Sequence, residues 1–502
     1  MNRAFEELRG RLAEISDLHA TVSLLEWDYE ITMPRAATAI RAAQISTVER
    51  LAHERATAPE LGRLLDDLEP EVAALDPASF EASLVRVARR DFEKAVRVPV
   101  ELRGELAHAS VEGHAVWVEA RERSDFALFR PALERNLELK LRYVECFDGY
   151  DDPYDVLLDD YEPDLKTADA AGVLARLRDE LVPLVADLSG EVLDDSFLTG
   201  TFPVERQRSL DRWLAARLGW DEDTWRLDEI VHPAQFNLAP TDIRIATRRS
   251  ERTLESVFSV LHEFGHGLYE RQVEPALART PLAEGASLGL HESQSRLWEN
   301  LVGRGLPFWT WFYPRLQETF AEQLSGVPLD RFYRAINKVK PSLIRVDADE
   351  VTYNLHVVLR FELERELLAG GIAVPELPEA WNERMERYLG VAVPDDARGV
   401  LQDSHWSGGG FGYFPTYSLG NVASVQIWQR IREALPDLER EIERGEFGSL
   451  REWLREALHR HGRKFTPVET LERAAGGPLD PGPYLSYLRE KSAEIYRLTA
   501  RR

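Results

Sequence analysis

The chain has very little cysteine, and this scarcity limits the chemistry that it can use. Cys146 is the only cysteine among 502 residues, so no disulfide can form within one chain, a pattern typical of a reducing cytoplasm. Its apolar-rich, helical surroundings predict a buried small residue rather than a nucleophile. The first 18 residues lack the apolar core of a signal peptide. We therefore expect a cytoplasmic protein.

Long apolar runs and basic clusters are missing as well. No stretch of 18 apolar residues occurs, so we expect no membrane span. The net charge is −25, and no basic patch of the kind that binds nucleic acid stands out. An acidic surface mainly keeps a protein soluble, so we expect no nucleic-acid or membrane partner.

Apolar residues that recur every three or four positions dominate the chain, and this spacing predicts amphipathic helices. The helical stretches are 5–25, 79–147, 169–189, 204–218, 310–338, 349–369, 421–443 and 447–461. Strand-like runs are few, and the best is 241–248. This strand is either an edge strand that holds a peptide backbone or a short connector. With no linker or repeat, the chain reads as one mainly α-helical unit over 1–502, which could form two lobes around a cleft.

The most informative stretch is His262-Glu263-Phe264-Gly265-His266. Residues four apart share one face of a helix, so the two imidazoles can bind one ion while Glu263 reaches a water molecule. This is the zinc-peptidase pattern of two ligands and a general base. Apolar residues around the motif support a helix, which Ser250 or Thr253 could cap. Gly265 costs a helix roughly 1 kcal/mol, which suggests that close packing requires it.

Catalytic zinc usually takes a third protein ligand. The helical stretch 291–300 offers two candidates, His291 and Glu292, and spacing alone does not choose between them. Position 272, where a nearby third histidine would fall, is Gln272. Glu299 follows Glu292 by about two helical turns and is a candidate outer partner for a metal-binding histidine.

The motifs together resemble those of the carboxypeptidase Taq family, the thermostable zinc metallocarboxypeptidases. The matching blocks run in order from about residue 25 to about 421: 25–28 with 33–34 and 41–44, 226–228 with 232–233, 242–244, 291–300, 344–349, 399–406 and 412–417. Two positions depart from the family pattern: Ala234 follows Pro233, and Ala246 ends the D-x-R-x-T motif.

The resemblance implies several properties. It identifies Glu292 as the third zinc ligand, beside His262 and His266. It implies a helical shell around a deep substrate groove, with a small β-sheet beside the zinc helix. It also implies removal of the C-terminal residue from peptides, and a homodimer. Either zinc or cobalt could be the working ion.

The remaining site residues are predicted from the chemistry of peptide hydrolysis. Glu263 would move the proton of the attacking water. Tyr413, Tyr417 and His405 are candidate donors to the oxyanion. They lie in or beside the glycine-rich stretch 407–412, which is either a mobile loop that closes on substrate or a tight structural turn.

A carboxypeptidase must also bind a free carboxylate, and a guanidinium suits that task. Arg345 is the first candidate, although it could instead pair with the nearby Asp347, Asp349 and Glu350. Arg244 is the second candidate, and His232 could line the same groove.

Two other functions fit parts of the pattern. A related helical zinc oligoendopeptidase or dipeptidase would share the zinc helix and lack the carboxylate clamp. An inactive peptide-binding scaffold would also keep the fold, but the intact metal motif argues against it.

Overall fold

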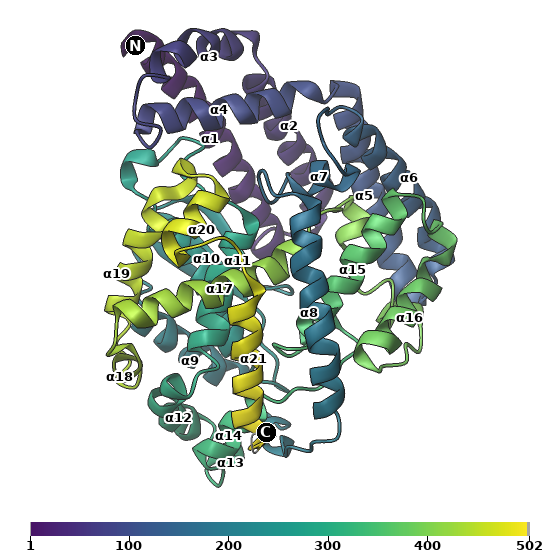
Figure 1. The fold of residues 1–502 in the computed structure, drawn as a ribbon, viewed down its shortest axis with the longest axis vertical. Helices are drawn as coiled ribbons and strands as arrows, with labels where there is room; N and C mark the ends of the chain where they lie inside the picture. The colour runs from purple at the N-terminus through teal and green to yellow at the C-terminus, as the bar shows by residue number, and fades with distance from the viewer. Residues whose placement is uncertain (1, 499–502) are drawn as a thin grey trace.

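The computed structural model describes residues 2–498 and confirms a mainly α-helical protein with one small sheet. Figure 1 shows the N-terminal helices gathered at one end of an elongated molecule and α12 to α14 at the other. The helix α17 crosses the middle and packs against α11. No helix within residues 2–498 is long and apolar enough to cross a membrane.

Along the sequence, the helices fall into one run before the three strands and one run after them. The first run is α1 (Asn2–Ile31), α2 (Thr38–Ala56), α3 (Pro59–Val72), α4 (Phe80–Arg97), α5 (Val100–Arg123), α6 (Phe126–Val144), α7 (Pro153–Leu158), α8 (Thr167–Leu188) and α9 (Val204–Leu218). The second run is α10 (Glu255–Arg271), α11 (Leu288–Arg296), α12 (Leu306–Thr319), α13 (Ala321–Leu324), α14 (Leu329–Ile336), α15 (Tyr353–Leu368), α16 (Leu377–Leu389), α17 (Pro415–Ala434), α18 (Leu438–Ile442), α19 (Gly448–Ala457), α20 (Pro467–Ala475) and α21 (Pro481–Tyr496).

The predicted helical stretches are confirmed, and prolines and turns divide the longest of them. The stretch 79–147 becomes three helices. The first break comes at Val98, whose extended backbone precedes Pro99, because a residue before proline disfavours the helical conformation. The second comes at Ser124, which adopts a left-handed conformation with φ of 53°.

The sheet corrects one prediction. Its strands are β1 (Trp225–Glu229), β2 (Ala234–Ala239) and β3 (Asp242–Thr247), and their order is β1-β3-β2. The strand predicted at 241–248 is therefore the central one, parallel to β1 and antiparallel to β2. The hypothesis that it is an edge strand holding a peptide is wrong, because both of its backbone edges are paired within the sheet.

Most buried apolar side chains belong to one large core that extends along the chain from Trp117 to Tyr496. A second core joins α1, α3 and α4 to the segment 273–282. Cys146 is only partly buried, so its predicted burial is corrected. Its thiol donates to the carbonyl of Arg142 at 3.4 Å, and burial raises the pKa of the thiol, which disfavours the reactive thiolate.

Glycines allow unusually close packing around α10. A Cβ atom added at Gly265 would lie 2.4 Å from the carbonyl oxygen of Gln294 on α11. One added at Gly267 would lie 2.4 Å from the indole of Trp225 on β1. The predicted packing role of Gly265 is thus confirmed, and α10 fits tightly between α11 and the sheet.

The predicted cap of α10 is wrong. The helix starts after Leu254, which provides no side-chain hydrogen bond. Ser250 instead bonds locally, with its hydroxyl accepting from the backbone N–H of Arg252.

Candidate active site

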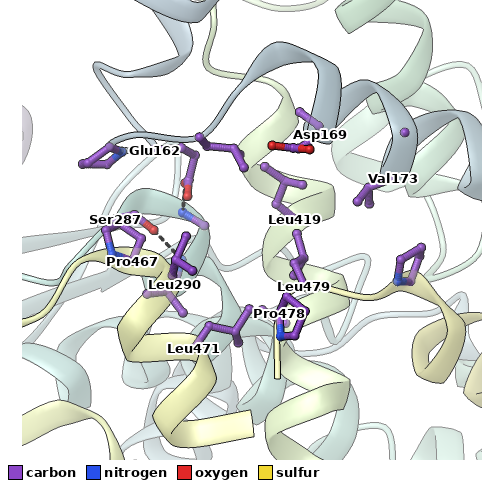
Figure 2. A pocket seen from close by; sticks show the side chains of 18 of the residues that line it. Glu162, Asp169, Val173, Ser287, Leu290, Leu419, Pro467, Leu471, Pro478 and Leu479 are labelled. Atoms are coloured by element: carbon purple, nitrogen blue, oxygen red, sulfur yellow. Dashed lines mark hydrogen bonds between the residues drawn. The ribbon is translucent and has the colours of Figure 1, made fainter. Parts of the chain in front are cut away.

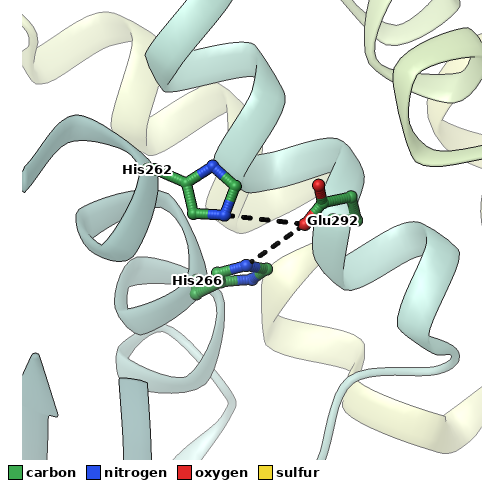
Figure 3. Close-up of side chains that lie close together, drawn as sticks. All are labelled: His262, His266 and Glu292. Atoms are coloured by element: carbon green, nitrogen blue, oxygen red, sulfur yellow. Dashed lines mark ion pairs between the residues drawn. The ribbon is translucent and has the colours of Figure 1, made fainter. Parts of the chain in front are cut away.

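Three side chains from α10 and α11 converge on one point (Figure 3). One donor atom from each of His262, His266 and Glu292 lies within 4.8 Å of the others. Glu292 Oε2 is 3.7 Å from Nε2 of His262 and 3.4 Å from Nε2 of His266. Two imidazoles and a carboxylate form the kind of donor set that binds zinc at catalytic sites.

Close helix packing explains why the three donors meet. The two histidines lie four residues apart on α10, and α11 approaches them because Gly265 has no side chain. From the other side, α17 presses on Glu292, since a Cβ atom at Gly420 would lie 2.7 Å from its Cβ and Cγ. Glu292 therefore has little room to turn away from the histidines.

The electrostatics of the cluster favour the metal-binding forms of His266 and Glu292, whereas, against the effect of burial, the Glu292 and Glu299 carboxylates raise the pKa of His262. Burial lowers the pKa of His266 to about 3, so its imidazole is neutral. Burial alone would raise the pKa of Glu292, but the Arg296 guanidinium and the nearby histidines hold it well below its usual range. Arg296 Nε donates to Glu292 Oε1 at 2.6 Å. A neutral imidazole and an ionised carboxylate are the forms that bind metal.

Glu263 lies beside the cluster and is 5% exposed. Burial raises the pKa of its carboxyl to about 7. A carboxyl group poised near neutral pH can both accept and return a proton, which is the property that the predicted role of Glu263 requires.

The outer contacts of the two histidines differ. Glu299 Oε2 lies 2.9 Å from His262 Nδ1, which confirms the contact that helical spacing suggested. A π-helical turn, Leu297–Val302, carries Glu299, and such turns are frequent at functional sites. His291, the rival third ligand, contacts His266 Nδ1 instead, at 2.6 Å. The structure therefore places Glu292, and not His291, at the point where His262 and His266 converge.

Arg345 is buried, but its partner is not one of the acidic residues near it in sequence. Its Nε and Nη2 donate to Asp403 Oδ1 at 3.1 and 2.8 Å, and its Nη1 donates to the Tyr353 hydroxyl at 2.8 Å. The second Asp403 oxygen accepts from Arg360 Nε at 2.7 Å. Asp403 therefore holds two buried guanidiniums, and the cluster carries a surplus positive charge.

Tyr353 connects this arginine cluster to the metal cluster. Its ring lies 4.5 Å from the guanidinium carbon of Arg296, which binds Glu292. Sequence reasoning missed Tyr353, Arg360 and Asp403. Asp403 lies two residues before His405 in the matched block 399–406. Because a buried arginine needs a carboxylate partner, this block could have identified Asp403 as the partner of Arg345.

The aromatic candidates lie together. His405 Nε2 is 3.2 Å from the Tyr417 hydroxyl, and its ring centroid is 5.1 Å from that of Tyr413. The Tyr417 ring also lies 4.7 Å from the Arg345 guanidinium carbon. Burial, together with the nearby Glu292 carboxylate, raises the pKa of Tyr413 to about 12, and burial raises the pKa of Tyr417 well above its usual value. Both phenols therefore stay protonated at neutral pH, as hydrogen-bond donors must.

The glycine-rich stretch 407–412 is tied to the helices around it. The buried Glu364 of α15 accepts from Trp406 Nε1 at 2.7 Å and from the Gly412 N–H at 3.0 Å. Asn136 of α6 donates to the Ser407 carbonyl at 2.8 Å. These contacts at both ends favour the tight structural turn over the mobile loop.

Arg244 and His232 have different surroundings. Arg244 makes two 2.9 Å hydrogen bonds to Asp242 and stacks 4.3 Å over the Trp27 ring of α1. His232 lies exposed in the turn between β1 and β2. Within residues 2–498, no hydrogen bond or ion pair joins either residue to the metal or arginine clusters.

A large apolar cavity lies elsewhere and contains none of the predicted site residues. It measures about 580 Å³, and leucine, valine and proline side chains of α8, α11, α17 and α20 dominate its wall (Figure 2). Leu290, on its wall, and Glu292 are two residues apart on α11. They point to nearly opposite sides of the helix, which turns about 100° per residue.

Comparison with known proteins agrees with this geometry. Thermostable carboxypeptidase 1 of Thermus thermophilus is 40% identical, over 98% of this chain and 99% of that protein. Carboxypeptidase 1 of Bacillus subtilis is 37% identical, over 98% and 99%. The crystal structure of an M32 carboxypeptidase from Deinococcus radiodurans matches with a TM-score of 0.94 and 42% identity, over 99% of this chain and 100% of that one.

The family model of the carboxypeptidase Taq (M32) metallopeptidases matches residues 7–492. The chain is thus a metallocarboxypeptidase and belongs to the carboxypeptidase Taq (M32) metallopeptidase family.

Proposed function

We propose that His262, His266 and Glu292 hold a catalytic zinc ion with which the enzyme removes the C-terminal residue of peptides. The observation that carries this proposal is the convergence of the three donors from two helices. The donor set fits zinc, because catalytic zinc takes three protein ligands of this kind and leaves a position for water. When bound, zinc lowers the pKa of a water molecule and polarises the scissile carbonyl. Cobalt is a candidate replacement ion.

Glu263 is the proposed general base. It accepts a proton from the attacking water and later returns that proton to the leaving amine. Its raised pKa, about 7, makes both transfers accessible near neutral pH. Tyr413, Tyr417 and His405 line the same region and are the proposed hydrogen-bond donors to the developing oxyanion.

Arg345 is the proposed partner of the substrate's terminal carboxylate. A guanidinium has five N–H donors, and three of those on Arg345 are used by Asp403 and Tyr353, which leaves two for a substrate. The surplus charge that Arg345 and Arg360 share around Asp403 would offset the cost of burying an anion. Arg244 and His232 have partners or positions that make them weaker candidates.

The finer aspects of the assembly are proposals too. We propose that the whole chain acts as one catalytic unit, since its main core extends from Trp117 to Tyr496. A homodimer in the cytoplasm is the expected state, on the family likeness and on the single cysteine. Light scattering across micromolar concentrations tests the dimer, and a steady mass of 57.3 kDa would contradict it.

One assay tests the activity. The purified enzyme is given matched peptides with free or amidated C-termini, with and without a chelator. We expect rapid cleavage of the free peptide and only slow cleavage of the amidated one, and loss of cleavage when the metal is removed. Equal cleavage of both peptides would instead support the oligoendopeptidase alternative, because an endopeptidase does not need a free carboxylate.

Arg345→Ala tests the clamp in the same assay. Losing a buried charged hydrogen bond costs about 2–5 kcal/mol, so activity on the free peptide should fall steeply. Slow cleavage of the amidated peptide should change little. Equal losses on both peptides would make Arg345 a structural residue, and Arg244→Ala would be the next variant to test.

A further inference from the structure

The two ligand histidines are supported from behind in different ways. His262 Nδ1 faces a carboxylate directly, at 2.9 Å from Glu299 Oε2. His266 Nδ1 faces another imidazole, at 2.6 Å from His291 Nδ1. Behind His266, the carboxylate is that of Glu270, which contacts His291 and not His266: His291 Nε2 lies 2.7 Å from Glu270 Oε1.

The donor and acceptor requirements of the ring nitrogens fix the direction of the hydrogen bonds in the series His266–His291–Glu270. His266 directs Nε2 towards the metal cluster, so that atom must offer a lone pair and the proton must sit on Nδ1. His291 Nδ1 must then accept a hydrogen bond from this N–H, which places the proton of His291 on Nε2. That proton points at Glu270, an acceptor. All three groups therefore have one consistent arrangement.

Glu270, at the end of this hydrogen-bonded series, is held by several contacts. Glu270 is 3% exposed, and it also accepts from Asn237 Nδ2 of β2 at 2.7 Å and from the Gly285 N–H at 3.3 Å. Gly285 makes room for the ring, since a Cβ atom there would lie 2.8 Å from His291 Cδ2. The imidazole of His291 is thus fixed at both nitrogens and along one edge.

We propose that His291 and Glu270 are positioning residues that hold the metal ligand His266 in its binding orientation and tautomer. This inference rests on the proposed metal site. Outer contacts of this kind orient a metal ligand and increase its basicity. A neutral imidazole is a weaker hydrogen-bond acceptor than a carboxylate. The orientation of His266 therefore depends on both His291 and Glu270, whereas that of His262 depends on Glu299 alone.

Metal affinity tests the proposal without relying on turnover. Zinc affinity of the refilled protein is measured by competition with a chelating dye, and visible absorption is recorded on the cobalt-loaded form. His291→Ala should weaken zinc binding about 10- to 100-fold and shift the cobalt bands. His291→Asn, which keeps an acceptor near the Nδ1 position, should recover part of the affinity, and Glu270→Gln should fall between the parent and His291→Ala.

A neighbouring histidine provides the matched control. His459 is fully buried, hydrogen-bonds through both ring nitrogens and stacks on Tyr269, whose other contacts include the His291 ring. Within residues 2–498, no hydrogen bond or ring contact joins His459 to His266. His459→Ala should therefore change zinc affinity less than about threefold, well below the effect expected behind a ligand.

Each outcome decides between positioning and packing. Parent-like zinc affinity and cobalt bands in His291→Ala would overturn the proposal, as would equal losses in His291→Ala and His459→Ala. If His291→Ala does not fold, the two volume-conserving variants decide, and parent-like affinity in both refutes positioning. A failure of the metal site itself looks different, because His262→Ala and Glu292→Ala would then also keep their metal.

Discussion

The helices α11 and α17 border two very different regions, the metal cluster and the apolar cavity of Figure 2. On the cluster side, charged groups lie close together, and Gly265 and Gly420 lack side chains that would collide with α11. On the cavity side, leucines and prolines surround about 580 Å³ of open volume. The two helices are therefore closely packed around Glu292 of α11 and border an open cavity a few residues away.

The difference teaches that concave apolar volume does not mark the chemistry of this protein. The convergent donor set lies in the tightly packed region, together with the strongly shifted pKa values of Glu263 and His266, although Glu162 on the cavity wall also has a raised pKa. Perturbed ionisable groups with specific partners are the better sign of a functional site. Four measurements test whether the metal cluster and the apolar cavity differ in this way.

The largest effect is expected from removing a carboxylate on each side. Glu263→Gln should keep its metal and fold but lose turnover by about 10²- to 10⁴-fold, because an amide cannot accept the water proton. Asp169→Asn, at the exposed mouth of the cavity, should stay within about twofold of the parent, as surface changes do. Near-parent turnover in metal-loaded Glu263→Gln would refute the general-base role.

Glu162 should give the cavity side a pH-dependent stability. Its carboxylate accepts the Gly289 N–H and so caps the start of α11, and burial raises its pKa to about 7. A carboxyl whose folded pKa exceeds its unfolded value stabilises the fold most below the unfolded pKa, and this stability is lost as pH rises through the folded pKa.

The measurable consequence lies between about pH 4.5 and 7. Over this window Glu162 should contribute a fall in the free energy of unfolding on the order of 3 kcal/mol. Urea unfolding of Glu162→Gln should show a flatter pH dependence than the parent. Glu364, whose pKa burial also raises to about 7, should keep part of the slope. An unchanged slope in Glu162→Gln would contradict the assignment.

Gly265→Ala should destabilise the tightly packed side by about 1–3 kcal/mol, the usual effect of overpacking. The new Cβ atom would meet the backbone of α11 at Gln294 and Ser295, which cannot move aside as a flexible side chain could. We also expect weaker zinc binding, because α11 must shift and it carries Glu292. Calorimetry and dye competition measure the two effects, and a parent-like melting temperature would show that the two helices have slack.

Gly172→Ala is the matched change at the cavity. Gly172 lies within α8, and nothing is within 4 Å of the place where its Cβ atom would sit. Alanine is favoured over glycine inside a helix by about 1 kcal/mol, so this variant should be slightly more stable than the parent. A loss of stability there would mean that the cavity wall is less open than the structure indicates.

Local patterns in the sequence were enough to predict the helices and the metal motif. Spacings of three and four set the helical periods, and two histidines four residues apart must share a helical face. Those patterns depend only on the geometry of one helix. They also suggested Glu299 as an outer partner of a metal-binding histidine, and the structure shows that its contact is with His262.

Choices between neighbours in sequence needed the tertiary structure. Spacing could not separate His291 from Glu292, since both lie on α11 and only the approach of α10 at Gly265 decides which one meets His262 and His266 together. Nor could it pair Arg345 with Asp403 and Tyr353, or put strand 242–247 in the centre of its sheet. These outcomes depend on contacts between distant segments, whereas sequence periodicity reports only which face of each segment is buried.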